Sequence, residues 1–323
     1  MHTPILQDIV FHDLHPPAVN IRQEVLQGLS NPEQRRISPK YLYDEKGSHL
    51  FDAICKTNDY YPTRTEHSII KDNMEKITGC IDTGCVLVEP GSGNSQKVRQ
   101  LLDAIQPRAY LPVDISKSYL KQEARKLASE FPWLEVHAVC ADFTEPVPLP
   151  AVDETGPKVA FFPGSSIGNF EPADAVEFLG NMADMVERGG GLLIGVDLKK
   201  ESAILNAAYN DSEGLTAAFN LNLLSRLNKD LDADFDLDRF DHKAFYNEDL
   251  GRIEMHLVST SDQQVQVAGE TFEFLKDETI HTENSYKYHV EEFHALAKKA
   301  GFHNPKVWTD EQELFSVHYL EAE

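Results

Sequence analysis

Two acidic side chains and a glycine turn near residue 90 have the types and the spacing to hold a small ligand. Glu89 and Pro90 lead into the turn Gly91-Ser92-Gly93. Glycine has no Cβ, so the backbone can turn tightly there and come close to a bound molecule. Asp114 follows 21 positions after Gly93, where nucleotide-binding folds place an acid that accepts hydrogen bonds from ribose hydroxyls. The simpler alternatives are an ordinary tight turn and an acid that caps the next helix.

The turn differs from the phosphate-binding loops. The third glycine of the dinucleotide fingerprint is absent, because Ser95 and Gln96 stand in its place, and no Gly-Lys-Ser/Thr follows. What remains, Glu-x-Gly-x-Gly, resembles the first motif of class I S-adenosylmethionine (SAM) methyltransferases. Further along, Asp142 and Phe143 could hold an adenine amino group and stack on its ring.

The elements that carry these residues alternate between strand and helix. Apolar runs predict strands at 86–88, 109–113, 134–139, 159–162 and 191–196, with helical patterns between them. This alternation predicts a doubly wound parallel sheet with helices on both faces, an α/β fold in which ligands lie at the carboxyl ends of the strands. Two closing strands, at 305–308 and 314–320, would complete a seven-stranded class I methyltransferase sheet whose last hairpin is antiparallel.

After Asp197 the alternation stops. Helices are expected at 203–209 and 215–227, then an exposed acidic run at 230–241, then short strands within 252–286. We therefore predict a second, discontinuous α+β domain for substrate binding, formed by residues 1–65 and 198–286. Residues 66–197 and 287–323 would form the SAM-binding domain.

The composition disfavours several classes of function. Among 323 residues, 53 acids against 30 basic side chains give a net charge of −23, which disfavours nucleic acid as a partner. No long apolar run predicts a membrane span, so a cytoplasmic protein is expected. The four cysteines form no Cys-x-x-Cys pair, and the thirteen histidines show no metal-ligand spacing. We therefore expect no metal.

Four longer motifs carry a family resemblance. They are Tyr-Leu-Tyr-Asp-Glu-Lys-Gly-Ser-x-Leu-Phe-Asp at 41–52, Tyr-Tyr-Pro-Thr-Arg at 60–64, Gly-Ser-Ser-Ile-Gly-Asn at 164–169 and Thr-Ala-Ala-Phe-Asn at 216–220. Together they resemble the histidine Nα-methyltransferases of ergothioneine biosynthesis, the EgtD type, over nearly the whole chain. That family converts histidine to its trimethyl betaine, hercynine, with three SAM molecules.

The resemblance also implies roles for individual residues. Tyr60, Asn169 and Tyr209 would hold the substrate's carboxylate and amine, with Tyr43 and Gly164 beside them; Tyr43, Asn169 and Gly164 are the expected catalytic set. Glu283 and Ser285 would grip the imidazole, and Met255 would shape that pocket. SAM would be bound by residues at the strand ends, namely Glu89, Gly91, Gly93, Lys97, Asp114, Asp142 and Phe143. Pro90 and Asn284 depart from the family pattern conservatively.

The chemistry of these residues agrees with methyl transfer to an amine. The sulfonium of SAM is already activated, so the protein mainly has to hold amine, methyl group and sulfur in line. Three alternatives remain: an Nα-methyltransferase for another amino acid such as tryptophan, a nicotinamide-dependent oxidoreductase, and a non-catalytic SAM-binding protein. A buried glutamate taken alone is more often a structural partner of Arg or Lys. The assignment of Glu283 to the substrate therefore rests on the whole set of motifs. A monomer acting on a small molecule is expected.

Overall fold

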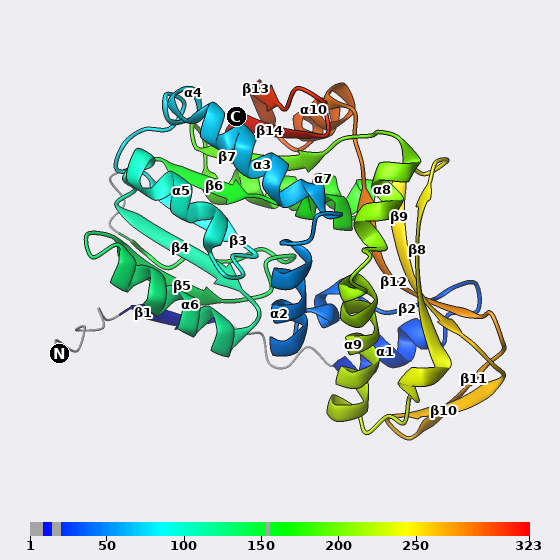
Figure 1. Cartoon of the computed structure of the whole chain (residues 1–323). Coiled ribbons are helices and arrows are strands. Elements are labelled where there is room, and N and C mark those ends of the chain that lie inside the picture. Colours follow the sequence, from blue (N-terminus) through cyan, green and yellow to red (C-terminus); the bar gives the residue numbers. More distant parts are fainter. Residues whose placement is uncertain (1–8, 15–20, 153–155) are drawn as a thin grey trace. The chain divides into compact units, whose positions relative to one another are not determined.

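The chain forms two compact units, each assembled from separate segments (Figure 1). The computed structural model describes residues 9–14, 21–152 and 156–323. The described residues of 1–16, 64–199 and 288–323 form the first unit, and those of 17–63 and 200–287 form the second. Both units are therefore discontinuous in the sequence.

The first unit contains an eight-stranded sheet. Its strand order is β1 (Val10–Asp13), β5 (Glu135–Cys140), β4 (Ala109–Asp114), β3 (Val86–Pro90), β6 (Lys158–Phe162), β7 (Gly191–Asp197), β14 (Phe315–Ala322) and β13 (Phe302–Thr309). The first six strands in this order pair in parallel, and β14 runs antiparallel to both β7 and β13. The predicted class I doubly wound sheet with an antiparallel final hairpin is confirmed.

The sheet has one strand more than the seven expected. Residues 10–13 form β1, which pairs in parallel with residues 137–140 of β5. The assignment of these residues to the second domain was therefore wrong, since they extend the sheet of the first unit. The strand has only four residues and Val10 is 44% exposed, so the sequence carries no periodic apolar signal for it.

Alternating side chains bury both faces of this sheet. Leu87 joins one core cluster, whereas its neighbours Val86 and Val88 join another. The first cluster is covered by α3 (Tyr61–Asp72), α4 (Met74–Thr78), α5 (Gln96–Ile105) and α6 (Lys117–Glu130). Met185 of α7 (Pro172–Val186) packs against the second cluster, and α10 (Val290–Lys299) contacts α7 (Figure 1). Burial on both faces accounts for the continuous apolar runs of the strands.

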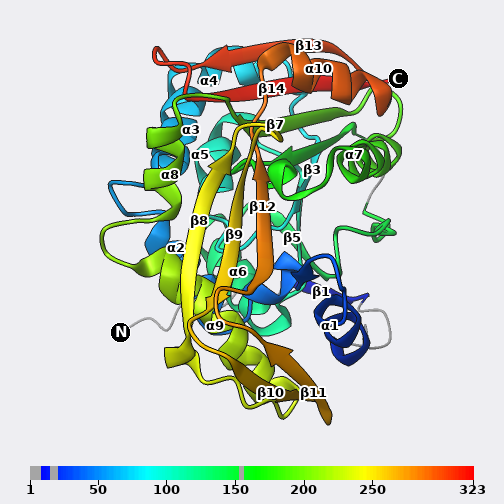
Figure 2. The same ribbon diagram turned by 90° about the vertical axis from the view of Figure 1, so that its right-hand side faces the viewer.

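The second unit is built on a four-stranded sheet, whose long strands lie side by side in Figure 2. The order is β2 (Arg35–Arg36), β12 (Thr279–Tyr286), β9 (Arg252–Ser259) and β8 (Phe240–Asn247). The helices α8 (Ser202–Tyr209) and α9 (Leu215–Asp230) contact β8 and β9. The remaining elements are α1 (Ile21–Leu29), α2 (Glu45–Ile54), the 3-10 helices η1 (Pro39–Leu42) and η3 (Leu237–Arg239), and the hairpin β10 (Gln263–Val267) and β11 (Glu270–Phe274).

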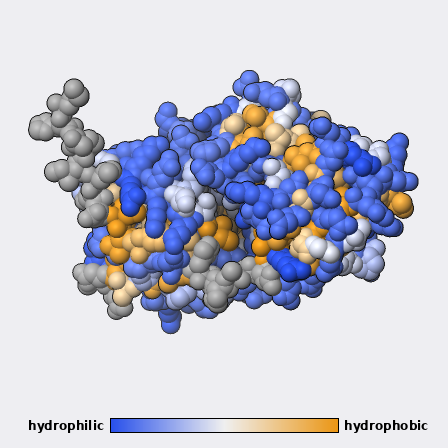
Figure 3. Space-filling model, turned by 90° about the horizontal axis from the view of Figure 1, so that it is seen from below, coloured by the Kyte–Doolittle hydropathy of each residue, from blue (hydrophilic) through white to orange (hydrophobic). Residues whose placement is uncertain are grey.

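The acidic run lies largely on the surface, as expected. Its six aspartates are exposed, whereas Phe235 and Phe240 are buried and Leu237 is partly buried. The structure adds strand β8, which begins at Phe240 and was not predicted. Figure 3 shows a face that is mainly hydrophilic, with hydrophobic residues in separate patches. Within the described residues, every helix is too short or too polar to span a bilayer.

Candidate active site

In the first unit, a glycine turn, a strand end and an aromatic ring come together. Gly91 and Gly93 have φ angles of 67° and 51°, in the left-handed region that favours glycine. A Cβ added at Gly91 would lie 3.1 Å from Cε1 of Phe143. The Gly93 N–H donates to Oδ2 of Asp114 at 3.0 Å. The turn after β3 is thus joined to the ends of β4 and β5, where a side chain at Gly91 would fill the space beside the Phe143 ring.

Asp114 and Asp142 both make bonds in the turns that follow their strands. Oδ1 of Asp114 accepts from the Ser116 N–H at 2.9 Å, which closes the turn before α6, whose N-cap residue is Ser116 rather than Asp114. A carboxylate oxygen has two lone pairs and can accept a second donor beside such a bond. Burial raises the pKa of the Asp114 carboxyl. Oδ1 of Asp142 accepts from the N–H and the hydroxyl of Thr144, at 3.0 and 2.6 Å.

Glu89 lies inside the unit, beneath the turn. It is 2% exposed, and its carboxyl bonds to the hydroxyl of Tyr110 on the neighbouring strand β4. The same hydroxyl lies 3.1 Å from Oγ of Ser95, the residue that precedes α5. Burial raises the pKa of Glu89 to about 8, against the opposing effect of the Tyr110 bond. Through these contacts the carboxyl links β3, β4 and the start of α5.

A buried acid that was not predicted connects Lys97 with Gly164. Glu66 on α3 is 1% exposed; its Oε2 pairs with Nζ of Lys97 at 2.9 Å, and its Oε1 accepts from the Gly164 N–H at 2.7 Å. Gly164 itself has a φ angle of 83°. Asn169 ends the 3-10 helix η2 (Ser166–Asn169) on the same loop after β6. Gly164 and Asn169 thus lie on one loop, and Lys97 is connected to that loop through Glu66.

In the second unit, a row of aromatic rings connects three of the expected tyrosines. Tyr43 packs edge-on against Phe51 and Phe219, with centroids 5.6 and 5.4 Å apart. Phe51 lies 6.2 Å from Tyr60, and Tyr60 lies 6.1 Å from Tyr209, again edge to face. The motif segments 41–52, 60–64 and 216–220 therefore meet through their side chains, together with the end of α8.

The end of this row reaches strand β12. The Tyr209 hydroxyl lies 2.8 Å from Oγ of Ser285. Glu283 lies two residues earlier on the strand, opposite Met255 of β9 in the strand pairing. Glu283 is 8% exposed, and its Oε2 has no hydrogen-bond partner among the described residues. Burial raises the pKa of its carboxyl to about 7, and the charge of Lys287 opposes that rise.

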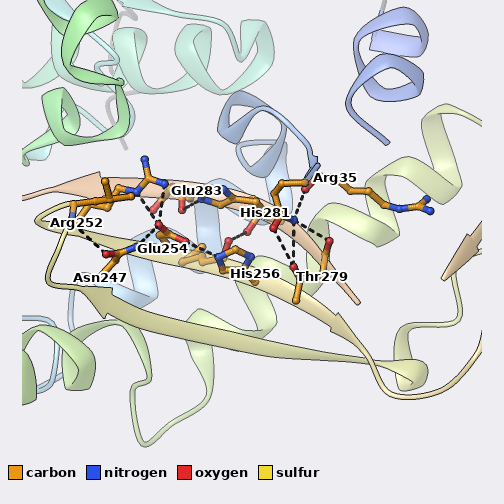
Figure 4. Close-up of polar contacts among 12 residues, drawn as sticks. Arg35, Asn247, Arg252, Glu254, His256, Thr279, His281 and Glu283 are labelled. Carbon is orange, nitrogen blue, oxygen red and sulfur yellow. Dashed lines mark hydrogen bonds and ion pairs between the residues drawn. The ribbon is translucent and has the colours of Figure 1, made fainter. Parts of the chain in front are cut away.

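Beside Glu283, four ionisable side chains form a separate network, drawn in Figure 4. Glu254 pairs with Arg252 at 2.8 Å and bonds to Nε2 of His256 at 3.0 Å. Burial is the main cause that lowers the pKa of His256 to about 4, and the charge of the neighbouring His281 contributes to that lowering. Glu254, His256 and His281 have the residue types of a metal site. Their two imidazoles, however, are stacked at 4.5 Å with planes 17° apart.

Stacked rings argue against a metal at this cluster. The lone pairs of an imidazole lie in the ring plane, so those of two stacked rings lie in separate, nearly parallel planes and do not converge on one point between them. A tetrahedral metal needs ligand atoms that converge at about 2 Å. The arrangement instead fits a hydrogen-bonded stack held by the Arg252–Glu254 ion pair. Sequence spacing could not show this group, since Glu254 and His256 come from β9 and His281 from β12.

The expected site residues are divided between the two units. Those assigned to SAM lie in the first unit, as do Gly164 and Asn169. Those assigned to the amino-acid side chain lie in the second, together with Tyr43, Tyr60 and Tyr209. Within each unit the structure brings most of its members into contact or onto one loop.

Comparisons with known proteins give a consistent result. Residues 21–322 match the family described as "Histidine-specific methyltransferase, SAM-dependent". The "Histidine N-alpha-methyltransferase" of Mycolicibacterium smegmatis is 40% identical over 90% of this chain and 91% of its own length. The protein of the same name from Mycobacterium tuberculosis is 38% identical over 92% of this chain and 93% of its own length. "Ergothioneine biosynthesis protein 1" of Neurospora crassa is 29% identical over 94% of this chain and 35% of its own length.

Proposed function

We propose that this chain, which belongs to the histidine-specific, SAM-dependent methyltransferase family, methylates the α-amine of L-histidine three times. The product would be hercynine, formed at an early step of ergothioneine biosynthesis, with S-adenosylhomocysteine released at each transfer. The relatives' names support methylation at the α-amine.

The observation that carries the choice of histidine is the Glu283 carboxylate. It is 8% exposed, and Oε2 has no hydrogen-bond partner among the described residues. A buried acceptor left unpaired costs about 1–3 kcal/mol, and more when it is charged. An imidazole N–H would satisfy it, while Ser285 on the same strand face would meet the second ring nitrogen. An indole has one ring nitrogen and a larger ring, so tryptophan fits this pair less well.

The first unit has the features that SAM needs. The absence of a side chain at Gly91 lets the turn approach the Phe143 ring closely, and Asp114 can accept further hydrogen bonds at the end of β4. We assign SAM binding to these residues together with Gly93, Lys97, Asp142 and Phe143; Glu89 would act by shaping the turn. SAM supplies a methyl group on a positively charged sulfur, which needs no metal for its activation.

The residues proposed for catalysis position the amine. We assign this to Tyr43, Asn169 and Gly164, with Tyr60 and Tyr209 helping to hold the amino acid. Hydroxyl and amide groups can orient an amine through hydrogen bonds without acting as strong bases. The amine must be neutral to attack, and its proton would pass to solvent before each transfer. We further propose that the enzyme works in the cytoplasm as a monomer, with no nucleic-acid partner.

The decisive test is mass spectrometry of histidine incubated with the protein and SAM. We expect mono-, di- and trimethylated histidine to appear in succession, with the methyl groups located on the α-nitrogen by fragmentation. Tryptophan and phenylalanine in parallel reactions serve as competitors. Methylation of tryptophan in preference to histidine would overturn the substrate assignment, and methylation on the imidazole would overturn the position.

A further inference from the structure

A buried lysine adjoins the pair of residues assigned to the imidazole. Glu283, Ser285 and Lys287 are spaced two residues apart along and just beyond β12, so their side chains point to the same side. Lys287 is 2% exposed. A lysine this deeply buried is rare unless its charge has partners, and neither the motifs nor the expected site included it.

The ammonium group of Lys287 bonds to two hydroxyls of the same pocket. Its Nζ lies 2.8 Å from Oγ of Ser285 and 3.2 Å from the hydroxyl of Tyr209. It also lies 5.0 Å from the centroid of the Tyr209 ring. With the 2.8 Å contact between the two hydroxyls, the three polar groups form a closed triangle.

Counting hydrogens fixes the direction of these bonds. An ammonium group can only donate, so both hydroxyl oxygens accept from Lys287. The hydroxyl–hydroxyl contact consumes one of the two hydroxyl hydrogens. Tyrosine is the stronger acid, with a pKa of about 10, and therefore donates to Ser285. The Ser285 oxygen then accepts twice, and its own hydrogen points out of the triangle as a donor.

Whereas Lys287 makes Ser285 a hydrogen-bond donor, its positive charge favours Glu283 as a hydrogen-bond acceptor. Lys287 is the charged group that counters the burial of Glu283 and favours its ionised form. The other ionisable groups nearby are on β9 and β12: Arg252 and Glu254 pair with each other, His256 bonds to Glu254, and Nε2 of His281 lies 3.1 Å from the backbone oxygen of Glu283 (Figure 4). On α8, Tyr209 faces Lys287. Removing Lys287 thus leaves Glu283 buried without its counter-charge.

We infer that Lys287 is a positioning residue that sets the hydrogen-bond polarity of the imidazole pocket, favouring the ionised, accepting form of Glu283 and holding Ser285 as a donor. The inference rests on the proposed function. A pocket with one acceptor and one donor matches a neutral imidazole in a single tautomer, with its N–H toward Glu283 and its bare nitrogen toward Ser285. It discriminates against rings that offer two donors or none.

The test uses the full-length protein with Lys287→Met and Lys287→Gln. Met removes charge and donor, whereas Gln keeps a donor without the charge. Loss of the counter-charge raises the pKa of Glu283, so the acid limb of kcat/KM for histidine should move to higher pH by about one unit in both variants. KM at neutral pH should rise about tenfold and recover toward wild type as the pH increases. Calorimetry with S-adenosylhomocysteine should show unchanged affinity.

Two further measurements separate this role from a general structural one. Lys200→Met is the matched control, because Lys200 also bonds to a tyrosine hydroxyl, that of Tyr61, at 2.6 Å; its pH profile should match wild type. Ser285→Ala should cost less in the Lys287→Met background than alone, since Ser285 is then no longer held as a donor. An unchanged acid limb in both Lys287 variants would overturn the inference. A wild-type protein that does not methylate histidine would instead overturn the proposed function.

Discussion

Removal of the Glu283 carboxylate should weaken histidine recognition more than it affects chemistry. The acid is buried, its Oε2 lacks a hydrogen-bond partner among the described residues, and Ser285 lies two residues further along the same strand. A hydrogen bond to a charged acceptor contributes about 1.5–3 kcal/mol. At about 1.4 kcal/mol for each factor of ten, Glu283→Ala should reduce kcat/KM for histidine roughly 10- to 200-fold.

The effect should fall mainly on KM. The imidazole is remote from the amine that reacts, so the lost bond is made equally in the ground state and the transition state. Glu283→Gln is the matched variant, because its amide oxygen still accepts a hydrogen bond without the charge; it should lie between Ala and wild type. Initial rates over a histidine series give both constants, and calorimetry with S-adenosylhomocysteine should be unaffected. Wild-type efficiency in Glu283→Ala would make this carboxyl a structural group and refute the assignment of the pocket.

Three other outcomes are expected, the last of them with a matched control. Asp114→Ala should weaken S-adenosylhomocysteine binding by about 1–3 kcal/mol, because ribose donors would lose their acceptor; unchanged affinity in calorimetry would exclude Asp114 from the cofactor site. The rate of the first methylation should rise from about pH 6 to about pH 8.5, since the amine must lose its proton, and a flat single-turnover profile would contradict this. Gly195→Ala should lower the free energy of unfolding by about 1–3 kcal/mol, because its Cβ would lie 1.9 Å from Oε1 of Glu66. Gly180→Ala, with nothing within 4 Å of the added Cβ, should be neutral or slightly stabilising in the same denaturant titration.

The sequence predicted the central sheet well because its strands carry strong local signals. Strands β3 to β7 are apolar runs bounded by turns, and burial on both faces requires such runs. Strand β1 escaped prediction because pairing with β5, rather than its own composition, makes it a strand. Strand β8 escaped because its first residues lie within the acidic run, where exposed aspartates mask the alternation.

The sequence predicted the candidate site residues that lie in recognisable motifs. It did not predict Glu66 and Lys287, whose importance becomes visible only from their contacts in the fold. Glu66 could have been noticed as an acid on the apolar face of α3, since Ile69 and Ile70 follow at helical spacing. Lys287 carried the same kind of signal, two residues beyond Ser285 on the alternating face. In both cases the partners are far away in the sequence or unremarkable by type, so the cost of burying the charge becomes visible only in three dimensions.

The order of strands in the first unit also constrains how the protein is made. Strand β14 lies between β7 and β13 in the sheet, yet it is the last strand in the chain. Until residues 315–321 have been synthesised, this edge of β7 has no partner strand, and exposed strand edges recruit other chains. Residues 200–287, which belong to the second unit, emerge during that interval. Completion of the first unit therefore depends on its latest residues, and incomplete chains should be especially prone to aggregation.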